Sequence, residues 1–261
     1  MHRLPKPIAE LQLIESGLFR SIGVQAFFTE RQGGISPPPF DTLNFGHGIG
    51  DDEDAVSINM ERLVHHAKLS SQPHQAEQVH GIEHLNCSGS GVIHSHEADI
   101  LITTESNIPI SVRTADCLPI LLADPVAKII AAVHAGWRGT AQRVAVRAIE
   151  LMQEQGATLE HIHATLWPSI GPCCFEIDSE TANQLTVSAS GALLAIEQRE
   201  KPHADLAAIN IMQLKEAGMI EEKIESNHYC THCYPERFYS YRRDQGQTGR
   251  HLAVVALPAD I

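Results

Sequence analysis

The sequence lacks several patterns that define common classes of protein. Its 261 residues contain no run of 18 apolar residues, so we expect no helix that spans a bilayer. No G-x-G-x-x-G motif follows a strand-like segment, which argues against a dinucleotide-binding Rossmann fold. No internal repeat and no linker divides the chain. We therefore expect a single domain over residues 1–261.

Positive charge is also scarce, with 19 Lys and Arg residues against 32 Asp and Glu and a formal net charge of −13. Nucleic-acid phosphates and anionic membranes are bound by clustered positive charge, so we expect neither partner. Residues 8–18 contain Glu10 and Glu15 and lack the uninterrupted apolar core of a signal peptide. We therefore expect a cytoplasmic protein whose six cysteines are reduced thiols or metal ligands.

Short apolar, β-branched segments alternate imperfectly with helical patterns along the chain. Segments of this kind predict strands at about 24–29, 99–103, 108–112, 118–123, 128–133, 162–167, 238–241 and 251–257. Apolar stripes at helical spacing predict helices at about 52–68, 140–155, 178–185 and 205–217. The clustering of strands in the middle favours an α/β (α+β-like) fold with mixed sheets layered against helices. The Gly- and Pro-rich segment 30–50 contains apolar anchors and is expected to be ordered.

Three residues with metal-ligating side chains stand at turn-like ends of the expected strands: His80, Cys117 and His134. Two imidazoles and one thiolate are the ligand set of an open catalytic zinc site, whose fourth position takes water or substrate. Their separations of 37 and 17 residues match no short zinc-finger spacing. A lone cysteine between strands is usually a small buried hydrophobic residue, and it is the presence of His80 and His134 that favours a ligand role for Cys117.

A second group contains His228, Cys230, His232 and Cys233. Cys-x-x-Cys is half of a structural zinc site, which needs four ligands. The adjacent Cys173 and Cys174 can offer one more ligand, but nothing in the sequence brings them near. Metal binding and reduced structural thiols both remain open for this group. Three further pairs are expected to be surface histidines: His65 and His66, His94 and His96, His161 and His163.

Arg138 stands where an expected strand passes through glycines into a helix. Backbone N–H groups and the helix dipole favour anions at such a point, so Arg138 is a candidate for binding phosphate or carboxylate. The alternative is a tight turn whose arginine pairs with a surface acid. A second basic segment, from Arg237 through Arg242 and Arg243 to Arg250, either pairs with internal acids or receives an anionic ligand.

Taken together, these segments resemble a known family. The matching segments are Phe28-Thr-Glu-Arg31-Gln-Gly-Gly-Ile-Ser36, Gln78-Val-His80-Gly81, Thr114-Ala-Asp116-Cys117-Leu-Pro, Val133-His134-Ala-Gly-Trp-Arg138-Gly139, Ile170-Gly-Pro-Cys-Cys and Arg242-Arg243-Asp244. In this order, over about residues 24–257, the chain resembles the YfiH-type laccase-domain proteins. These were first called multicopper polyphenol oxidases and are now regarded as purine nucleoside phosphorylases. The resemblance implies one α/β domain with mixed sheets and a metal triad at His80, Cys117 and His134.

The resemblance also implies an activity: zinc-dependent phosphorolysis of adenosine, inosine, guanosine and methylthioadenosine, together with adenosine deamination. Purine nucleosides and phosphate are then the expected partners, and a homo-oligomer is compatible with the sequence. Copper-dependent polyphenol oxidation is the weaker alternative, because multicopper sites need many more histidines. Editing of peptidoglycan precursors and a non-catalytic zinc-binding role are the remaining alternatives.

Five further residues complete the expected site. Arg31 and Arg138 are candidates for phosphate binding, because guanidinium forks match phosphate oxygens. Asp116 is expected to orient a ligand or to move a proton. Asn44 and Gln78 are expected to hydrogen-bond the sugar or the base.

Overall fold

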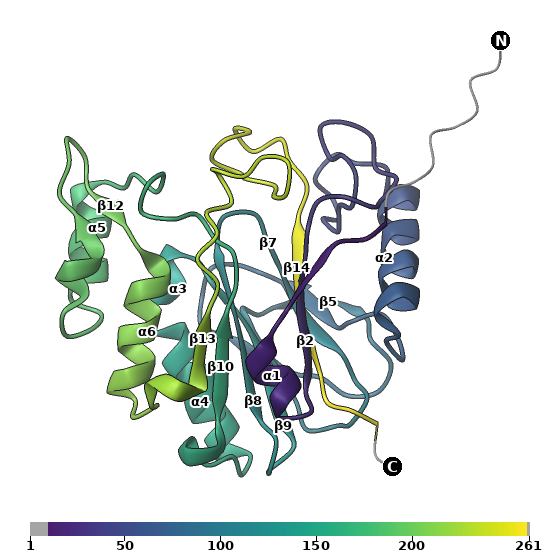
Figure 1. Cartoon of the computed structure of the whole chain (residues 1–261), viewed down its shortest axis with the longest axis horizontal. Coiled ribbons are helices and arrows are strands. Elements are labelled where there is room, and N and C mark those ends of the chain that lie inside the picture. The colour runs from purple at the N-terminus through teal and green to yellow at the C-terminus, as the bar shows by residue number, and fades with distance from the viewer. Residues whose placement is uncertain (1–9, 260–261) are drawn as a thin grey trace.

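Two β-sheets stacked face to face form the centre of the protein, and helices cover both outer faces (Figure 1). The structure is a computed structural model and describes residues 10–259. It confirms the α/β class with mixed sheets layered against helices. Within the described residues, no helix is long and apolar enough to cross a membrane.

The six-stranded sheet has the order β13-β10-β8-β9-β6-β4. The outer pairs β13–β10 and β6–β4 are parallel, and the other neighbours are antiparallel. The strands are β4 (His84–Asn86), β6 (Ile100–Thr103), β8 (Leu118–Asp124), β9 (Ile129–Ala135), β10 (His163–Leu166) and β13 (Ile224–Ser226). Successive side chains of a strand point to opposite faces, so β8 and β9 supply apolar residues to both sides of this sheet.

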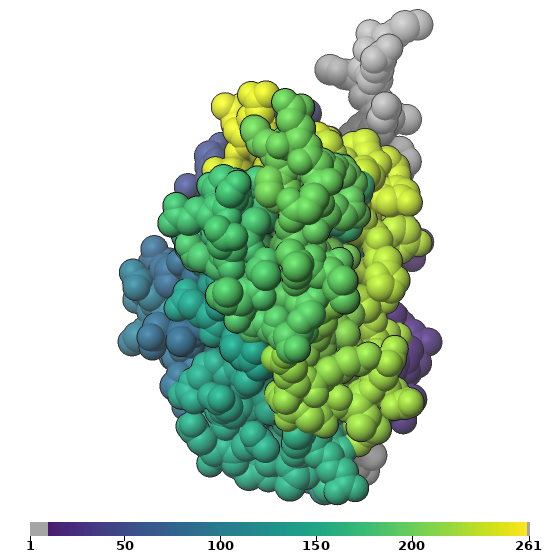
Figure 2. Space-filling model, turned by 90° about the vertical axis from the view of Figure 1, so that its left-hand side faces the viewer, coloured from purple at the N-terminus to yellow at the C-terminus, as the bar shows by residue number. Residues whose placement is uncertain are grey.

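One face of this sheet packs against helices, and the other packs against the second sheet. The helical layer contains α3 (Trp137–Ala141), α4 (Val144–Glu154), α5 (Ser179–Thr186) and α6 (Leu206–Glu216). Figure 2 looks onto this layer, where the green chain carrying α5 and α6 lies beside the yellow-green chain that follows β13. Three 3₁₀ turns, at Leu159–His161, Ala192–Ala195 and Glu221–Lys223, connect these elements.

The second sheet is antiparallel, with the order β1-β2-β14-β7. Its strands are β1 (Leu13–Glu15), β2 (Gln25–Thr29), β7 (Ile110–Thr114) and β14 (His251–Ala256). Phe28, Ala253 and Val255 face the six-stranded sheet, whereas Phe27 and Val254 face α2 (Glu53–Ala67) on the outside. The smaller elements are α1 (Gly17–Ser21), the parallel pair β3 (Gln75–Glu77) and β5 (Ile93–Glu97), and the pair β11 (Ile196–Glu197) and β12 (His203–Ala204).

Most of the predicted elements are confirmed, and two are wrong. The helix predicted over 140–155 is two helices, α3 and α4, because Arg143 adopts a left-handed backbone with φ of 63° between them. The strand predicted at 238–241 does not form. Its aromatic residues Phe238 and Tyr239 instead pack around the buried ring of His251, and the Tyr239 backbone N–H donates to His251 Nε2. The short elements were not predicted: α1, β1, β3, β4, β5, β11, β12 and β13.

A buried asparagine on α2 fixes the long segment that precedes this helix. Asn59 is fully buried, and its Oδ1 accepts a hydrogen bond from the backbone N–H of Ile35 at 2.9 Å. Its Nδ2 lies within hydrogen-bond distance of three acceptors: Ser36 Oγ and the carbonyl oxygens of Thr42 and Asn44. These bonds explain why segment 30–50 is ordered despite its glycines and prolines.

We expect Asn59→Ala to lower the free energy of unfolding by about 3 kcal/mol, because it leaves buried backbone groups of this segment without partners. Urea denaturation measures the change. Glu61→Ala, at an exposed position on the same helix, is the matched control and is expected to change stability by less than about 0.5 kcal/mol. Equal stabilities of the two variants would contradict the role given to Asn59.

Candidate active site

Strand register brings the three predicted metal ligands to one edge of the six-stranded sheet. In β8 and β9, Leu118 pairs with Ala135, so Cys117, just before β8, lies beside the end of β9 that carries His134. His80 comes from the turn after β3. Its backbone is left-handed, with φ of 63°. The ligand atoms of the three residues all lie within 4.8 Å of one another.

The geometry of this trio suits a tetrahedral metal ion. Cys117 Sγ lies 3.8 Å from His80 Nε2. A sulfur and a nitrogen on one tetrahedral zinc ion are about 3.6 Å apart, given usual zinc–ligand distances. Three protein ligands leave a fourth position for water or substrate. The donor set therefore fits an open metal site.

Asp99, which the sequence analysis did not single out, organises both histidines. Its fully buried carboxylate accepts a hydrogen bond from His134 Nδ1 at 2.7 Å, which leaves Nε2 free to bind a metal. The same carboxylate accepts the backbone N–H groups of Val79, His80 and Gly81 and so holds the turn that presents His80. The only signal in the sequence was an acidic residue directly before an apolar strand.

Charges in the trio favour a thiolate. Burial opposes ionisation of Cys117, but its interactions with His134 and His80 outweigh burial and lower the pKa of the thiol to about 6. Burial also opposes a charge on His134, whereas Cys117 and Asp99 raise the pKa of this imidazole to about 9. Both shifts favour a thiolate at Cys117 beside a charged imidazole at His134. A metal ion bound here would displace the imidazole proton.

Gly136 permits the close approach of the ligands. A Cβ atom at this position would lie 2.8 Å from His80 Cδ2 and 3.2 Å from Cys117 Sγ. Contacts this short require the ligands to move. Gly136 is therefore needed to leave space for His80 and Cys117, as well as for the turn into α3.

Asp116 fixes the wall of the site next to Cys117. Its carboxylate accepts hydrogen bonds from Thr231 Oγ1 at 2.6 Å, Ser240 Oγ at 3.0 Å and the backbone N–H of Arg242 at 2.7 Å. These bonds tie the residue before Cys117 to the C-terminal segment 227–250. The structure thus gives Asp116 a positioning role.

The trio opens into a cavity of about 590 Å³, a size suited to a small molecule. Four arginines line it: Arg113, Arg138, Arg242 and Arg250. Apolar and aromatic side chains make up much of the remaining wall: Ile49, Trp137, Ile170, Phe175, Leu206 and Tyr241. The other lining residues are Gly46, His47, Glu77, Gln78, Thr114, Ala115 and Asp116, besides the three ligands.

Of the four residues predicted to bind substrate, two line the cavity and two do not. Arg138 and Gln78 line the cavity, although the Gln78 amide is also paired with the backbone of Arg113. Arg31 does not line the cavity, because its guanidinium binds the carbonyl oxygens of Asp41 and Pro235. Asn44 is fully buried behind the cavity wall and accepts the backbone N–H of Arg250.

The sequence analysis did not single out Arg113, whereas Arg250 belongs to the basic segment expected to pair with internal acids or to receive an anionic ligand. Arg113 Nη2 donates to the Ala76 carbonyl, and Arg250 Nη1 donates to the carbonyl of Thr248. Burial and the charge of Arg250 together lower the pKa of Arg113. A charged residue at the end of an apolar strand was the available signal for Arg113. An anion between the two arginines would relieve their repulsion.

Three side chains able to bind a metal lie in an arginine-lined cavity on a two-sheet α/β scaffold, an arrangement typical of an enzyme that acts on small molecules. The family model described as multi-copper polyphenol oxidoreductase laccase matches residues 25–258. The chain belongs to this family, also known from its YfiH-type laccase-domain members.

Curated relatives and solved structures agree with this assignment. The chain is 36% identical to a purine nucleoside phosphorylase of Deinococcus radiodurans, over 91% of each chain. It is also 36% identical to purine nucleoside phosphorylase YfiH of Escherichia coli K12, over 90% of this chain and 94% of the relative. The crystal structure of YlmD from Geobacillus stearothermophilus superposes with a TM-score of 0.87 at 29% identity, with 98% of each chain covered. That of the hypothetical protein YfiH from Bacillus licheniformis gives 0.88 at 26% identity, over 97% of this chain and all of that one.

We expect Asp99→Asn to weaken binding of Zn²⁺, used as the probe metal, by about 10- to 100-fold, because His134 loses the carboxylate that orients it. Competition with a chelator of known affinity measures the effect. Asp124→Asn is the matched control: Asp124 is equally buried and also accepts three backbone N–H bonds, at the far end of β8. An equal loss of zinc affinity in both variants would contradict the role given to Asp99.

Proposed function

We propose that this protein is a purine nucleoside phosphorylase that uses a zinc ion held by His80, Cys117 and His134. The observation that carries the proposal is the open three-ligand site inside a cavity lined by arginines. The reaction is the cleavage of adenosine, inosine, guanosine or methylthioadenosine by phosphate. A phosphate oxygen forms a bond to the ribose C1′, the bond from C1′ to the purine nitrogen breaks, and its electron pair leaves with the base.

Arg138 is the best-placed phosphate ligand. It lines the cavity and stacks on Trp137, with its guanidinium carbon 4.4 Å from the ring centroid. Among residues 10–259, its guanidinium has no hydrogen-bond or ion-pair partner, so its fork is available to two phosphate oxygens. Arg113 and Arg250 lie on the same cavity wall and add positive charge.

The apolar part of the cavity suits the nucleoside. Trp137, Phe175 and Tyr241 offer aromatic surfaces against which a purine ring packs. Burying the base and the phosphate in one cavity excludes water from the reacting centre and holds the two reactants together, which lowers the entropic cost of the reaction. Gln78, held by Arg113, is positioned to bond a polar edge of the sugar or base.

When bound, the zinc ion supplies a Lewis acid beside the reacting oxygen. The chain's own residues set that point: Asp99 fixes His134, the turn at 79–81 fixes His80, and Gly136 leaves room for Cys117. The same open position supports the proposed adenosine deamination, in which water adds at the purine C6 and ammonia departs. Polyphenol oxidation is supported less well, because three histidines line the cavity and a multicopper centre needs many more.

Replacement of Cys117 tests the metal site directly. We expect Cys117→Ala to lose the zinc bound there and to lower kcat/KM for adenosine with phosphate by more than about 100-fold, because the Lewis acid is lost. Metal analysis and release of free adenine measure the two effects. Cys87→Ala, a buried cysteine outside the cavity, is the control and is expected to stay active. Full zinc content and full activity in Cys117→Ala would refute the site.

Replacement of Arg138 tests the phosphate contact. We expect Arg138→Ala to raise the KM for phosphate by about tenfold or more, with adenosine deamination less affected, because only phosphorolysis uses the anion. Steady-state assays of adenine and of ammonia separate the two reactions. Arg147→Ala, a surface arginine paired with Glu150 and Glu154 on α4, is the matched control. Equal loss of both reactions in Arg138→Ala would mean that this arginine is structural.

A further inference from the structure

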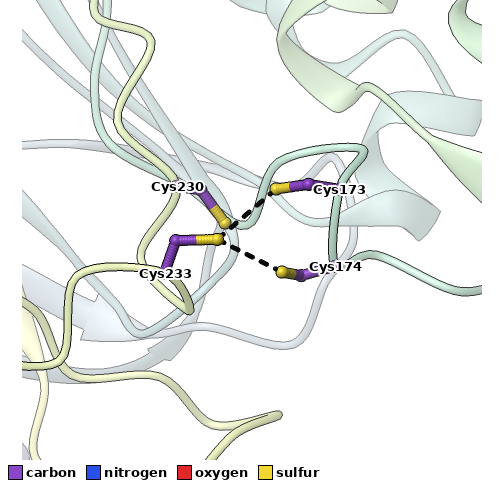
Figure 3. A group of neighbouring side chains, drawn as sticks. All are labelled: Cys173, Cys174, Cys230 and Cys233. Atoms are coloured by element: carbon purple, nitrogen blue, oxygen red, sulfur yellow. Dashed lines mark hydrogen bonds between the residues drawn. The ribbon is translucent and has the colours of Figure 1, made fainter.

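Four of the six cysteines gather in one group that does not line the cavity (Figure 3). Cys173 and Cys174 belong to the turn after β10, and Cys230 and Cys233 belong to the segment after β13. Cys233 Sγ lies 3.6 Å from Cys173 Sγ and 3.4 Å from Cys174 Sγ. All four sulfur atoms lie within 4.8 Å of one another.

The pairing of β10 with β13 brings Cys173 and Cys174 close to the Cys-x-x-Cys segment, which the sequence alone did not indicate. Strands β10 and β13 run parallel, with Leu166 opposite Ser226, and the pairing continues as a bridge between Ser169 and Cys230. Two segments about 60 residues apart in sequence therefore leave the sheet side by side. The turn at 173–174 closes over the Cys-x-x-Cys turn, so four sulfur atoms from two loops point at one place.

The spacing of the sulfur atoms matches a mononuclear four-thiolate site. Two sulfur atoms on one tetrahedral zinc ion are about 3.8 Å apart, given a zinc–sulfur distance near 2.3 Å. A disulfide needs sulfur atoms about 2.05 Å apart, and none of the described cysteines is so bonded. An iron–sulfur cluster places its thiolates on separate iron atoms and so needs a wider group.

One backbone N–H at the cluster donates to a sulfur atom, and another closes the Cys-x-x-Cys turn. The N–H of Gly171 donates to Cys230 Sγ at 3.2 Å, and the N–H of Cys233 closes the Cys-x-x-Cys turn on the Cys230 carbonyl at 3.1 Å. N–H groups aimed at a sulfur stabilise a thiolate, as the outer partners of metal ligands do. Gly171 also makes room for the group, since a Cβ there would lie 3.3 Å from Cys230 Cβ.

We propose that Cys173, Cys174, Cys230 and Cys233 form a structural zinc site. Four protein ligands close the coordination sphere, so this ion has no position for substrate, unlike the one proposed at His80, Cys117 and His134. Four packed thiols gain little from one another, whereas a divalent cation neutralises thiolates that would otherwise repel. The proposal does not depend on the activity of the protein.

This site would join two walls of the cavity. Phe175 follows Cys174 directly and lines the cavity, and Tyr241 and Arg242 come from the same segment as Cys230 and Cys233. Thr231, next to Cys230, donates to the Asp116 carboxylate. A zinc ion between the two loops therefore fixes the part of the wall that Asp116 holds from the other side.

The experiment uses the full chain and counts zinc by mass spectrometry of the metal. We expect about two zinc ions per chain in the wild type and about one in Cys117→Ala, which leaves the four-cysteine site intact. X-ray absorption of the zinc in Cys117→Ala should show sulfur neighbours alone, at about 2.3 Å. A nitrogen or oxygen neighbour in that spectrum, iron in place of zinc, or a metal-free Cys117→Ala protein with disulfide-linked cysteines would overturn the proposal.

Two further variants test whether the zinc ion that remains in Cys117→Ala is bound by the four cysteines. In the Cys117→Ala background, Cys233→Ser is expected to remove the last zinc and to lower Tm. His232→Ala is the matched control, since it changes a metal-capable residue in the same turn and should keep the ion. Loss of zinc in His232→Ala but not in Cys233→Ser would overturn the assignment. A wild type with two zinc ions and no phosphorolysis would refute the proposed function and leave this site standing.

Discussion

The buried carboxylate of Asp99 is the interaction on which the arrangement of the metal ligands depends. It binds His134 through Nδ1 and holds the turn at 79–81 through three backbone N–H groups, so one side chain fixes two ligands from distant parts of the chain. Burial opposes its charge, but these bonds outweigh burial and lower the pKa of the carboxyl. Asp99 therefore stays ionised, and the two imidazoles keep their positions when no metal is bound.

Asp116 is a second buried carboxylate, and it holds the chain next to Cys117. It precedes Cys117 and binds the segment that carries Arg242. Both carboxylates lie at the same edge of the six-stranded sheet, where the register of β6, β8 and β9 brings their chain segments together. The sheet thus supplies the rigid part of the site, and loops held by buried acids supply the cavity wall.

Local residue chemistry predicted the main strands and most helices, because apolar runs are visible in short segments. It also singled out His80, Cys117 and His134, whose ligand atoms the structure places within 4.8 Å of one another. It did not predict the break at Arg143 or the role of Asp99, since both depend on partners distant in sequence. Cys173 and Cys174 show the same limit: their nearness to Cys233 comes from the pairing of β10 with β13, which no spacing in the sequence encodes. Phe238 and Tyr239 have strand-forming side chains, but a buried histidine ring gave them other packing partners.

The positive charge of the cavity contrasts with the acidic composition of the chain. A net charge of −13 repels anions at long range, yet four arginines converge on one cavity. Arg113 and Arg250 are held there by carbonyl oxygens rather than by carboxylates, so their charges are not cancelled by an ion pair. The arginines repel one another, and an anionic ligand bound between them would relieve that repulsion. A neutral nucleoside alone would not account for them, whereas the proposed pair of nucleoside and phosphate would.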